Sequence, residues 1–331
     1  MTVEIEFMNI LVTGGAGYIG SIVAERLIEN AYKVIIYDNL STGNIESLPE
    51  NAILVEADIS NRNALKNTLL DYEIEAVMHF AAFSLVSESF KDPFKYYNNN
   101  LVGGLALLET MLETGIKKIV FSSTAAVYGE PMELPITENH PTNPINPYGE
   151  TKLAFERALH SLDKTLGLRF ISLRYFNAAG ASKNRGEKHN PETHLIPIVL
   201  EVAMGKRQAV QVFGDDYPTR DGTCIRDYVH VLDIADAHLK ALESLNDESK
   251  IFNLGCGAGY SVLEVIEAAR KVTGKNIPIN FQERRKGEPA VLIASSKKIQ
   301  HELGWKPKFT SLEEIIESAW KWMIQTEKVM I

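Results

Sequence analysis

Cysteine is scarce in this sequence, because only Cys224 and Cys256 occur among 331 residues. They form no CxxC pair and no spacing typical of zinc ligands, so a disulfide framework and a zinc finger are excluded. We therefore expect two reduced thiols in a cytoplasmic protein.

Long apolar runs and an excess of positive charge are also missing. No stretch reaches the roughly 18 consecutive apolar residues of a membrane span, and the segment MTVEIEFMNILV carries glutamates where a signal peptide would be basic. The formal net charge is -9, which gives no field attractive to nucleic acid or to an anionic membrane. No such partner is expected, and an anionic ligand must be met by local cations.

What the sequence does have is a repeated alternation of short β-branched runs with helical patterns. Runs without a strict apolar/polar alternation are typical of strands buried on both faces of a parallel sheet. Six such runs lie at 9–13, 33–38, 52–58, 76–82, 118–124 and 169–176. The predicted fold class is α/β, a Rossmann-type doubly wound parallel sheet.

From about Ala178 the alternation stops, and loops rich in Gly, Asn, Asp and Pro follow. We predict a first domain over residues 1–177 and a smaller, mixed α/β domain over 178–331. The segment at about 226–255 is expected to pack back on the first domain. Further on, a strand at 251–255 and helices at 261–271 and 311–326 are predicted.

The stretch ILVTGGAGYIGSIVAERL places glycines between a strand and an amphipathic helix. Gly15, Gly17 and Gly20 match the dinucleotide fingerprint, in which the backbone approaches a pyrophosphate at the positive end of the helix. Asp38 ends the next strand at the distance expected for a ribose-binding carboxylate. Because that carboxylate would repel a 2'-phosphate and no arginine follows it, NAD is favoured over NADP, and the first domain is predicted to bind it.

Tyr148 and Lys152 stand four residues apart in NPYGETK, so they share one face of a predicted helix. A tyrosine with a pKa near 10 is a poor base at neutral pH. A cation about 4 Å away contributes on the order of 4 kcal/mol, enough to lower that pKa by about three units. Ser122 and Thr124 end the preceding strand, where ligands bind in open α/β sheets, and Thr124 is the predicted partner of the reacting hydroxyl.

These motifs resemble those of the extended short-chain dehydrogenase/reductase family, and within it those of enzymes that invert C4 of UDP-hexoses. The likeness covers nearly the whole chain, through VTGGAGYIG, YDNLSTG, VMHFAA, YYNNN, FSSTAAVYG, NPYGETK, RYFNAAGA, FGDDYPTRDGTCIRDYVHV, NLGCG, RRKGEPA and ELGW. The resemblance implies that a hydride leaves C4 for tightly held NAD while Tyr148 takes the hydroxyl proton. The 4-keto sugar then turns and receives the hydride on its other face, which interconverts UDP-galactose and UDP-glucose.

The resemblance also implies a set of site residues. Tyr148, Lys152 and Thr124 would be catalytic. The cofactor would be held by Gly14, Gly17, Tyr18, Ile19, Gly20, Asp38, Asn39, Asp58, Ile59, Phe80, Ala81, Ala82, Asn98 (or Asn100), Ser122, Tyr148, Lys152 and Tyr175. The UDP-sugar would be held by Thr124, Asn177, His194, Leu195, Phe213, Arg226, Tyr228, Arg285, Glu288 and Leu292. Relatives pair through helices near 93–114 and 148–165, which implies a homodimer.

Several positions depart from the family pattern. Ser84 stands where some relatives carry a cofactor-binding lysine, Glu288 where aspartate is usual, and His194 where asparagine is common. Leu292 falls where the side chain beside the C2 substituent is aromatic in some relatives and small in others. We hypothesise that UDP-N-acetylhexosamines are also substrates.

Three alternatives differ in the residues that they require. A nucleotide-sugar 4,6-dehydratase would need an acidic pair after Thr124, where Ala125 and Ala126 stand instead. A UDP-glucuronate 4-epimerase needs the same machinery and stays open. A non-catalytic NAD sensor predicts the loss of Tyr148 or Lys152, and both are present. His189 and His194 lie in a loop without a partnered ligand pattern, so no metal site is predicted.

Overall fold

The computed structural model describes residues 8–245, 248–285 and 287–329. These residues fall into two compact units, each assembled from several segments. The first contains the residues up to Ser123 with Glu150–Leu173 and Ala235–Ile251, and the second contains Thr124–Gly149, Arg174–Ile234 and the residues from Phe252 onward. The domain boundary at residue 177 stays a prediction.

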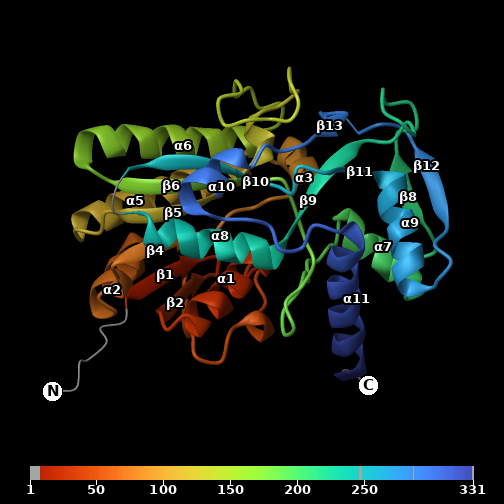
Figure 1. Ribbon diagram of the computed structural model, residues 1–331. Coiled ribbons are helices and arrows are strands. Elements are labelled where there is room, and N and C mark those ends of the chain that lie inside the picture. The colour runs from red at the N-terminus through yellow and green to blue at the C-terminus, as the bar shows by residue number, and fades with distance from the viewer. Residues whose placement is uncertain (1–7, 246–247, 286, 330–331) are drawn as a thin grey trace. The chain divides into compact units, whose positions relative to one another are not determined.

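A seven-stranded sheet in the order β10-β6-β5-β4-β1-β2-β3 confirms the predicted doubly wound fold (Figure 1). The pairs β3–β2, β2–β1, β1–β4 and β4–β5 are parallel. The chain moves from β1 to β2 and β3 on one side and returns to β4 on the other, so the strand order reverses between β1 and β4. In such sheets ligands bind at this reversal, beyond the carboxyl ends of the strands. The strands are β1 Asn9–Thr13, β2 Lys33–Asp38, β3 Ile53–Glu56, β4 Ala76–His79, β5 Lys118–Thr124, β6 Arg169–Tyr175 and β10 Lys250–Leu254.

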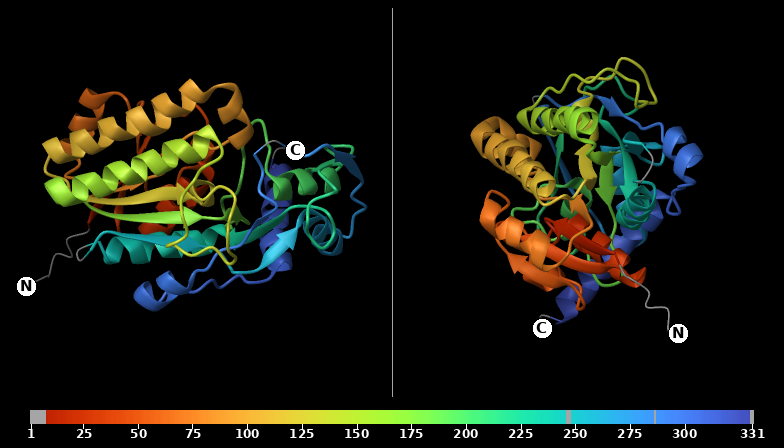
Figure 2. Two further views of the ribbon diagram at one scale, coloured as in Figure 1. Left: turned by 90° about the horizontal axis from the view of Figure 1, so that it is seen from above. Right: turned by 90° about the vertical axis from the view of Figure 1, so that its left-hand side faces the viewer.

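Helices cover both faces of this sheet, as expected for strands with few polar residues. Helices α2, α5 and α6 lie on one face, where Leu65, Leu107 and Phe155 share one buried cluster with strand residues (Figure 2). Helix α1 is joined to α8 by Arg26 Nε, which donates to Asp236 Oδ1 over 2.8 Å. The helices and helical turns are α1 Tyr18–Glu29, η1 Ile45–Ser47, α2 Arg62–Asp71, α3 Val86–Lys91, α4 Pro93–Tyr96, the π-helical η2 Tyr97–Gly103, α5 Gly104–Glu113, α6 Pro147–Leu166 and α8 Val231–Glu243.

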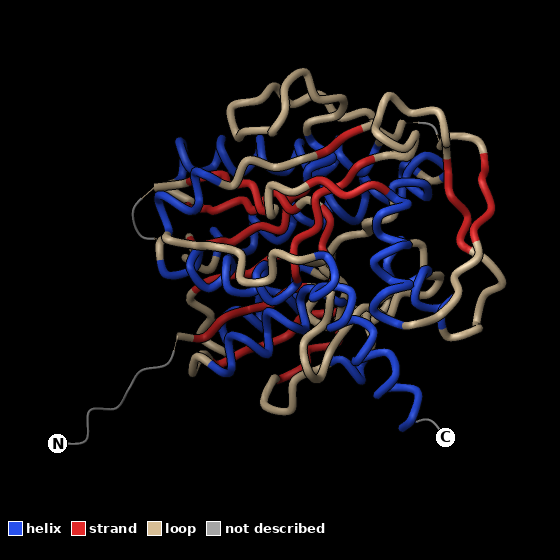
Figure 3. Tube along the Cα trace, turned by 45° about the vertical axis from the view of Figure 1, so that its right-hand side comes forward, coloured by secondary structure: helices blue, strands red, loops and turns tan. Residues whose placement is uncertain are grey.

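The second unit is mixed α/β, as Figure 3 shows by colouring its strands red and its helices blue. Strand β9 pairs with β7, β11 and β13, while β8 pairs with β12. Helices α7, α9 and α11 share one buried cluster, and α9 begins with a capping box between Ser261 and Glu264. The elements are η3 Ala125–Val127, β7 Asn177–Ala179, α7 Leu195–Ala203, β8 Val210–Phe213, β9 Ile225–His230, β11 Gly259–Ser261, α9 Val262–Thr273, β12 Ile279–Gln282, β13 Val291–Leu292, α10 Lys297–Leu303 and α11 Leu312–Val329.

Within the described part of the chain, no helix combines the length and the apolar character needed to cross a lipid bilayer.

Candidate functional site

The glycine loop joins β1 to α1, and its glycines permit contacts that a larger residue would block. Gly14 has φ +71°, and a Cβ on it would lie 2.5 Å from the Ala81 nitrogen. A Cβ on Gly20 would lie 2.3 Å from the Gly14 carbonyl oxygen. Gly17 precedes the first turn of α1 and gives it no side-chain cap, and the N-terminus of this helix is where the fold binds a pyrophosphate.

The loop after β4 lies against the glycine loop. Strand β4 ends at His79 and not at residue 82 as predicted, so Phe80, Ala81 and Ala82 belong to this loop. The Phe80 amide donates to the Thr13 carbonyl over 2.9 Å. Ala81 then lies against Gly14, at the reversal of the strand order. The predicted cofactor residues Phe80, Ala81 and Ala82 therefore stand at the position where this fold binds nucleotides.

Asp38 ends β2 and is tied to the glycine loop. Its Oδ2 accepts from the Ala16 amide and its Oδ1 from the Leu40 amide, both over 2.9 Å. Burial raises the pKa of Asp38, while these two hydrogen bonds oppose the rise. The remaining lone pairs of the carboxylate can accept from a ribose diol, so these residues fit the NAD that the sequence predicted.

Asp58 and Asn39, both predicted cofactor residues, lie together. Asn39 Nδ2 donates to Asp58 Oδ2 over 2.7 Å, and the hydroxyl of Ser60, with its amide, lowers the pKa of Asp58. Ile59 is buried, and a Cβ on Gly103 would lie 2.7 Å from its Cγ2 atom. The strand that was predicted to reach residue 58 ends at Glu56, which leaves Asp58 in a turn.

Lys152 is buried on α6, and its Nζ donates to the Ser122 carbonyl over 2.9 Å. The ammonium also lies 4.9 Å from the centroid of the Phe121 ring. Burial lowers the pKa of Lys152 to about 7, and the nearby Glu156 carboxylate opposes that shift. Lys152 and Ser122, both predicted cofactor residues, thus lie together.

Asn98 and Asn100 have different surroundings. Asn98 is exposed, and its cofactor contact stays a prediction. Asn100 is buried, where its Oδ1 accepts from the Phe83 amide over 2.8 Å and its Nδ2 donates to the Phe83 carbonyl over 2.9 Å. Asn100 therefore anchors the loop after β4, a role that the sequence did not predict for it.

Tyr148 begins α6 and hydrogen-bonds the side chain of Thr124. Burial raises the pKa of Tyr148, and the Thr124 hydroxyl opposes the rise. Gly149 allows this approach, because a Cβ there would lie 2.6 Å from the Ala126 carbonyl oxygen. Because the pKa of Tyr148 is raised overall, its phenol stays neutral, and its ionisation requires an additional positive charge.

Seven of the ten residues predicted to hold the UDP-sugar form three groups on strands and loops of the second unit. Arg285 stacks on Phe213, with its guanidinium carbon 3.8 Å from the ring centroid. Arg226 NH2 donates to Glu288 Oε1 over 3.2 Å, and Leu292 on β13 is paired with Arg226 on β9. Asn177 on β7 is paired with Tyr228 on β9. Tyr175, a predicted cofactor residue, is buried.

His194 precedes α7, whose first residue is Leu195. Its Nδ1 lies 2.7 Å from Glu187 Oε1 and 2.9 Å from Glu192 Oε1. Burial alone would lower the pKa of His194, but the two carboxylates raise it to about 10. The sequence patterns did not predict these partners.

Asp227 is a second residue that sequence reasoning missed. It is fully buried and accepts hydrogen bonds from the amides of Cys256, Gly257 and Ala294. Burial raises its pKa to about 6, against the effect of the three donors. Asp227 thus holds two loops beside Arg226, and the only signal was an acidic residue within a short strand that also carries Arg226 and His230.

Comparison with known proteins gives consistent results. A sequence profile of the GDP-mannose 4,6 dehydratase family matches residues 11–319. The chain is 54% identical to the UDP-glucose 4-epimerase of Halalkalibacterium halodurans, over 95% of each chain. It is similar to the crystal structure of UDP-glucose 4-epimerase from Brucella ovis in complex with NAD, with a TM-score of 0.91, 44% identity and coverage of 95% of this chain and 97% of that one. It is also similar to the UDP-Glc/GlcNAc 4-epimerase of Campylobacter jejuni, with a TM-score of 0.84, 42% identity and coverage of 96% and 99%.

Proposed function

The chain belongs to the UDP-glucose 4-epimerases, a branch of the extended short-chain dehydrogenase/reductases, and on this premise we propose which residues carry out its reaction. It is an NAD-dependent isomerase that interconverts UDP-galactose and UDP-glucose. Tyr148 is the proposed base for the C4 hydroxyl. The observation that carries this assignment is the hydrogen bond between Tyr148 and Thr124 at the start of α6.

Bound NAD supplies the hydride acceptor at C4 and an additional positive charge. Lys152, one helical turn from Tyr148, is proposed to bind the nicotinamide ribose and to favour the phenolate. Thr124 is proposed to orient the proton that Tyr148 removes and later returns. Asp38, Asp58 and the glycine loop are proposed to hold the adenosine and the pyrophosphate.

Arg226 and Arg285 are the proposed ligands of the UDP diphosphate, because guanidinium groups pair well with phosphate oxygens. Arg285 already stacks on Phe213, which is the proposed uracil neighbour. Glu288 is proposed to contact the ribose while its carboxylate orients Arg226. Asn177 and Tyr228, with His194 and Leu195, complete the proposed substrate set.

The first test is to incubate purified protein, without added cofactor, with UDP-galactose, UDP-N-acetylgalactosamine or UDP-glucuronate, and to follow anomeric protons by NMR. We expect conversion of UDP-galactose and of the acetylated sugar, because Leu292 is neither aromatic nor small and is half-buried. UDP-glucuronate should stay unchanged. No conversion of UDP-galactose with bound NAD present would contradict the plain-hexose assignment.

Leu292→Tyr should remove activity on the acetylated sugar selectively, because the larger ring fills the space that the acetamide needs. The activity on UDP-galactose should change by less than about threefold, since a single hydrophobic contact affects the preference between substrates and takes no part in the hydride or proton transfer. Initial rates on both sugars measure this. Equal rates on UDP-N-acetylgalactosamine for the variant and the parent would show that Leu292 does not determine acetyl acceptance.

Removal of the Thr124 hydroxyl should shift the pH dependence of the reaction. The hydroxyl lowers the pKa of Tyr148, so Thr124→Ala should raise it and move the rising limb of kcat/KM to higher pH. Thr124→Ser keeps the hydroxyl and should leave the profile in place. The pH–rate profile for UDP-galactose tests this, and an unchanged limb in the alanine variant would mean that the hydroxyl does not act on Tyr148.

We also propose that the protein is a cytoplasmic homodimer. Both cysteines are free, which suits a reducing compartment. Several large apolar side chains are exposed on α4, η2 and α5, namely Phe94, Tyr97, Val102 and Leu105. A patch of this kind is typical of a surface that a second chain covers.

Leu105→Arg should convert the dimer into monomers, because it places a charge within that apolar patch. Leu70→Arg is the matched control, since Leu70 is also an exposed helical leucine but lies on α2. Analytical ultracentrifugation measures the mass of both variants and of the parent chain. A parent chain that sediments as a monomer would refute the proposed assembly.

A further inference from the structure

Four potential metal ligands converge in the loop that leads into α7. Glu187, His189, Glu192 and His194 each offer one donor atom, and these atoms all lie within 4.8 Å of one another. Besides the two contacts of His194, the Nδ1 atom of His189 lies 3.1 Å from Glu187 Oε1. The prediction that this loop lacks a ligand pattern considered the histidines without the two glutamates.

The cluster is held in place by its surroundings. The Glu192 Oε1 atom accepts from the amides of Thr193 and His194, both over 2.8 Å. The side chains of Glu187 and Glu192 are only 8% and 6% exposed. These shielded carboxylates are paired with the two histidines, and a bound cation would supply the compensating positive charge in their place.

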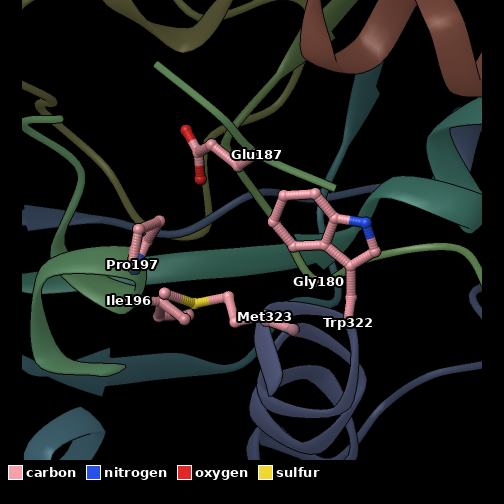
Figure 4. Close-up of a pocket in the computed structure, with 7 residues that line it drawn as sticks. Gly180, Glu187, Ile196, Pro197, Trp322 and Met323 are labelled. Atoms are coloured by element: carbon pink, nitrogen blue, oxygen red, sulfur yellow. The ribbon is translucent and has the colours of Figure 1, made fainter. Parts of the chain in front are cut away.

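Glu187 also borders a small pocket with Gly180, Ile196, Pro197, Ala319, Trp322 and Met323. Figure 4 shows its side chain on the side of this pocket opposite Met323, with Pro197 and Trp322 to either side. Gly186 packs so tightly that a Cβ on it would lie 2.5 Å from the Trp322 ring. The close packing of Gly186 on Trp322 therefore fixes the backbone next to Glu187.

The donor set fits a transition-metal ion better than magnesium or calcium. Two imidazole nitrogens with two carboxylate oxygens are ligands that zinc accepts in tetrahedral geometry, at about 2.0–2.2 Å from the metal. Neighbouring donors in such a site are then separated by about 3.3 Å. Three donor pairs here lie at hydrogen-bond distances of 2.7–3.1 Å and the whole set within 4.8 Å, so small shifts of these side chains would accommodate an ion. A divalent ion bound to two neutral imidazoles would also offset the charges of the two carboxylates.

We propose that Glu187, His189, Glu192 and His194 form a site for a divalent transition-metal ion of the zinc type. The ion would fix the 187–194 loop at the start of α7. Its role is structural, because the hydride and proton transfers of epimerisation are assigned to other residues. The site does not involve Tyr148 or Lys152, but it includes His194, so a bound ion would hold His194 in place of a direct contact from that residue to the substrate.

The test uses the untagged, full-length protein with its retained NAD, treated with EDTA and desalted. Titration with Co²⁺ is followed by visible absorption, and Zn²⁺ uptake after equilibrium dialysis by elemental analysis. We expect about one ion per chain, a visible band typical of four-coordinate Co²⁺, and displacement of Co²⁺ by Zn²⁺. Zinc should also raise the melting temperature, because a ligand that binds only the folded state stabilises it.

His189→Gln removes one ligand at a partly exposed position and should weaken Co²⁺ and Zn²⁺ binding at least about tenfold. His301→Gln is the matched control, since His301 is exposed on α10, outside the cluster. Glu192→Gln provides a second variant of the site, and circular dichroism checks the folding of each protein. Uptake that matches between His189→Gln and the parent, or no uptake by the parent, would overturn the proposal.

Discussion

Tyr148→Phe should lower kcat for UDP-galactose by about 10²–10⁴-fold, the usual contribution of a positioned acid or base. The phenyl ring keeps the packing at the start of α6, and only the hydroxyl that hydrogen-bonds Thr124 is lost. NAD should stay bound, since the glycine loop and Asp38 are unchanged. NMR of the sugar measures the rate, and absorbance of nucleotide released by denaturation measures bound NAD.

Tyr72→Phe serves as the control for this variant. Tyr72 caps the end of α2, and its ring packs against the core of the first unit. Removal of its hydroxyl should change kcat by less than about twofold, because Tyr72 lies at the end of α2 and is not among the residues proposed to bind cofactor or substrate. If Tyr148→Phe retains a third or more of the parent rate with full NAD occupancy, another group is the base.

Lys152→Met should lower kcat/KM at neutral pH by about a thousandfold. A cation near Tyr148 is needed to lower a pKa that burial raises, and about three pKa units correspond to about 4 kcal/mol. The variant should therefore recover activity as the pH rises, with its rising limb displaced by about three pH units. The pH–rate profile separates this effect from a general loss of structure.

Lys164→Met is the control on the same helix, because Lys164 is exposed near the end of α6. It loses the same charge without loss of a buried contact. Its pH–rate profile should overlay that of the parent chain. A Lys152→Met profile with lowered height but an unshifted limb would mean that Lys152 only positions the cofactor and does not tune Tyr148.

The sheet and the cofactor motif were readable from the sequence because they depend on local patterns. Apolar runs at 9–13, 33–38 and 118–124 became β1, β2 and β5 at the predicted bounds. Gly14, Gly20 and Asp38 could be assigned to the cofactor site, because each lies close in the chain to a predicted strand, turn or helix that defines its role.

Contacts between distant segments could not be predicted in this way. Ala81 lies against Gly14, although 67 positions separate them, and Asn100 on η2 anchors the backbone of Phe83 across the intervening helices α3 and α4. Neither contact leaves a repeat or a spacing in the sequence. The burial of Lys152, which lowers its pKa to about 7, likewise depends on what packs around α6.

The sequence by itself determined the fold class, the preference for NAD and the identity of Tyr148 and Lys152 as a pair, because periodicity, glycine and charge act over a few residues. Only the tertiary structure decided which partners surround these groups: Thr124 on Tyr148, Ser122 on Lys152, and two glutamates around His194. The physical reason is that desolvation and hydrogen bonding are set by neighbours in space. A side chain's residue type gives its chemistry, and the folded chain gives its environment.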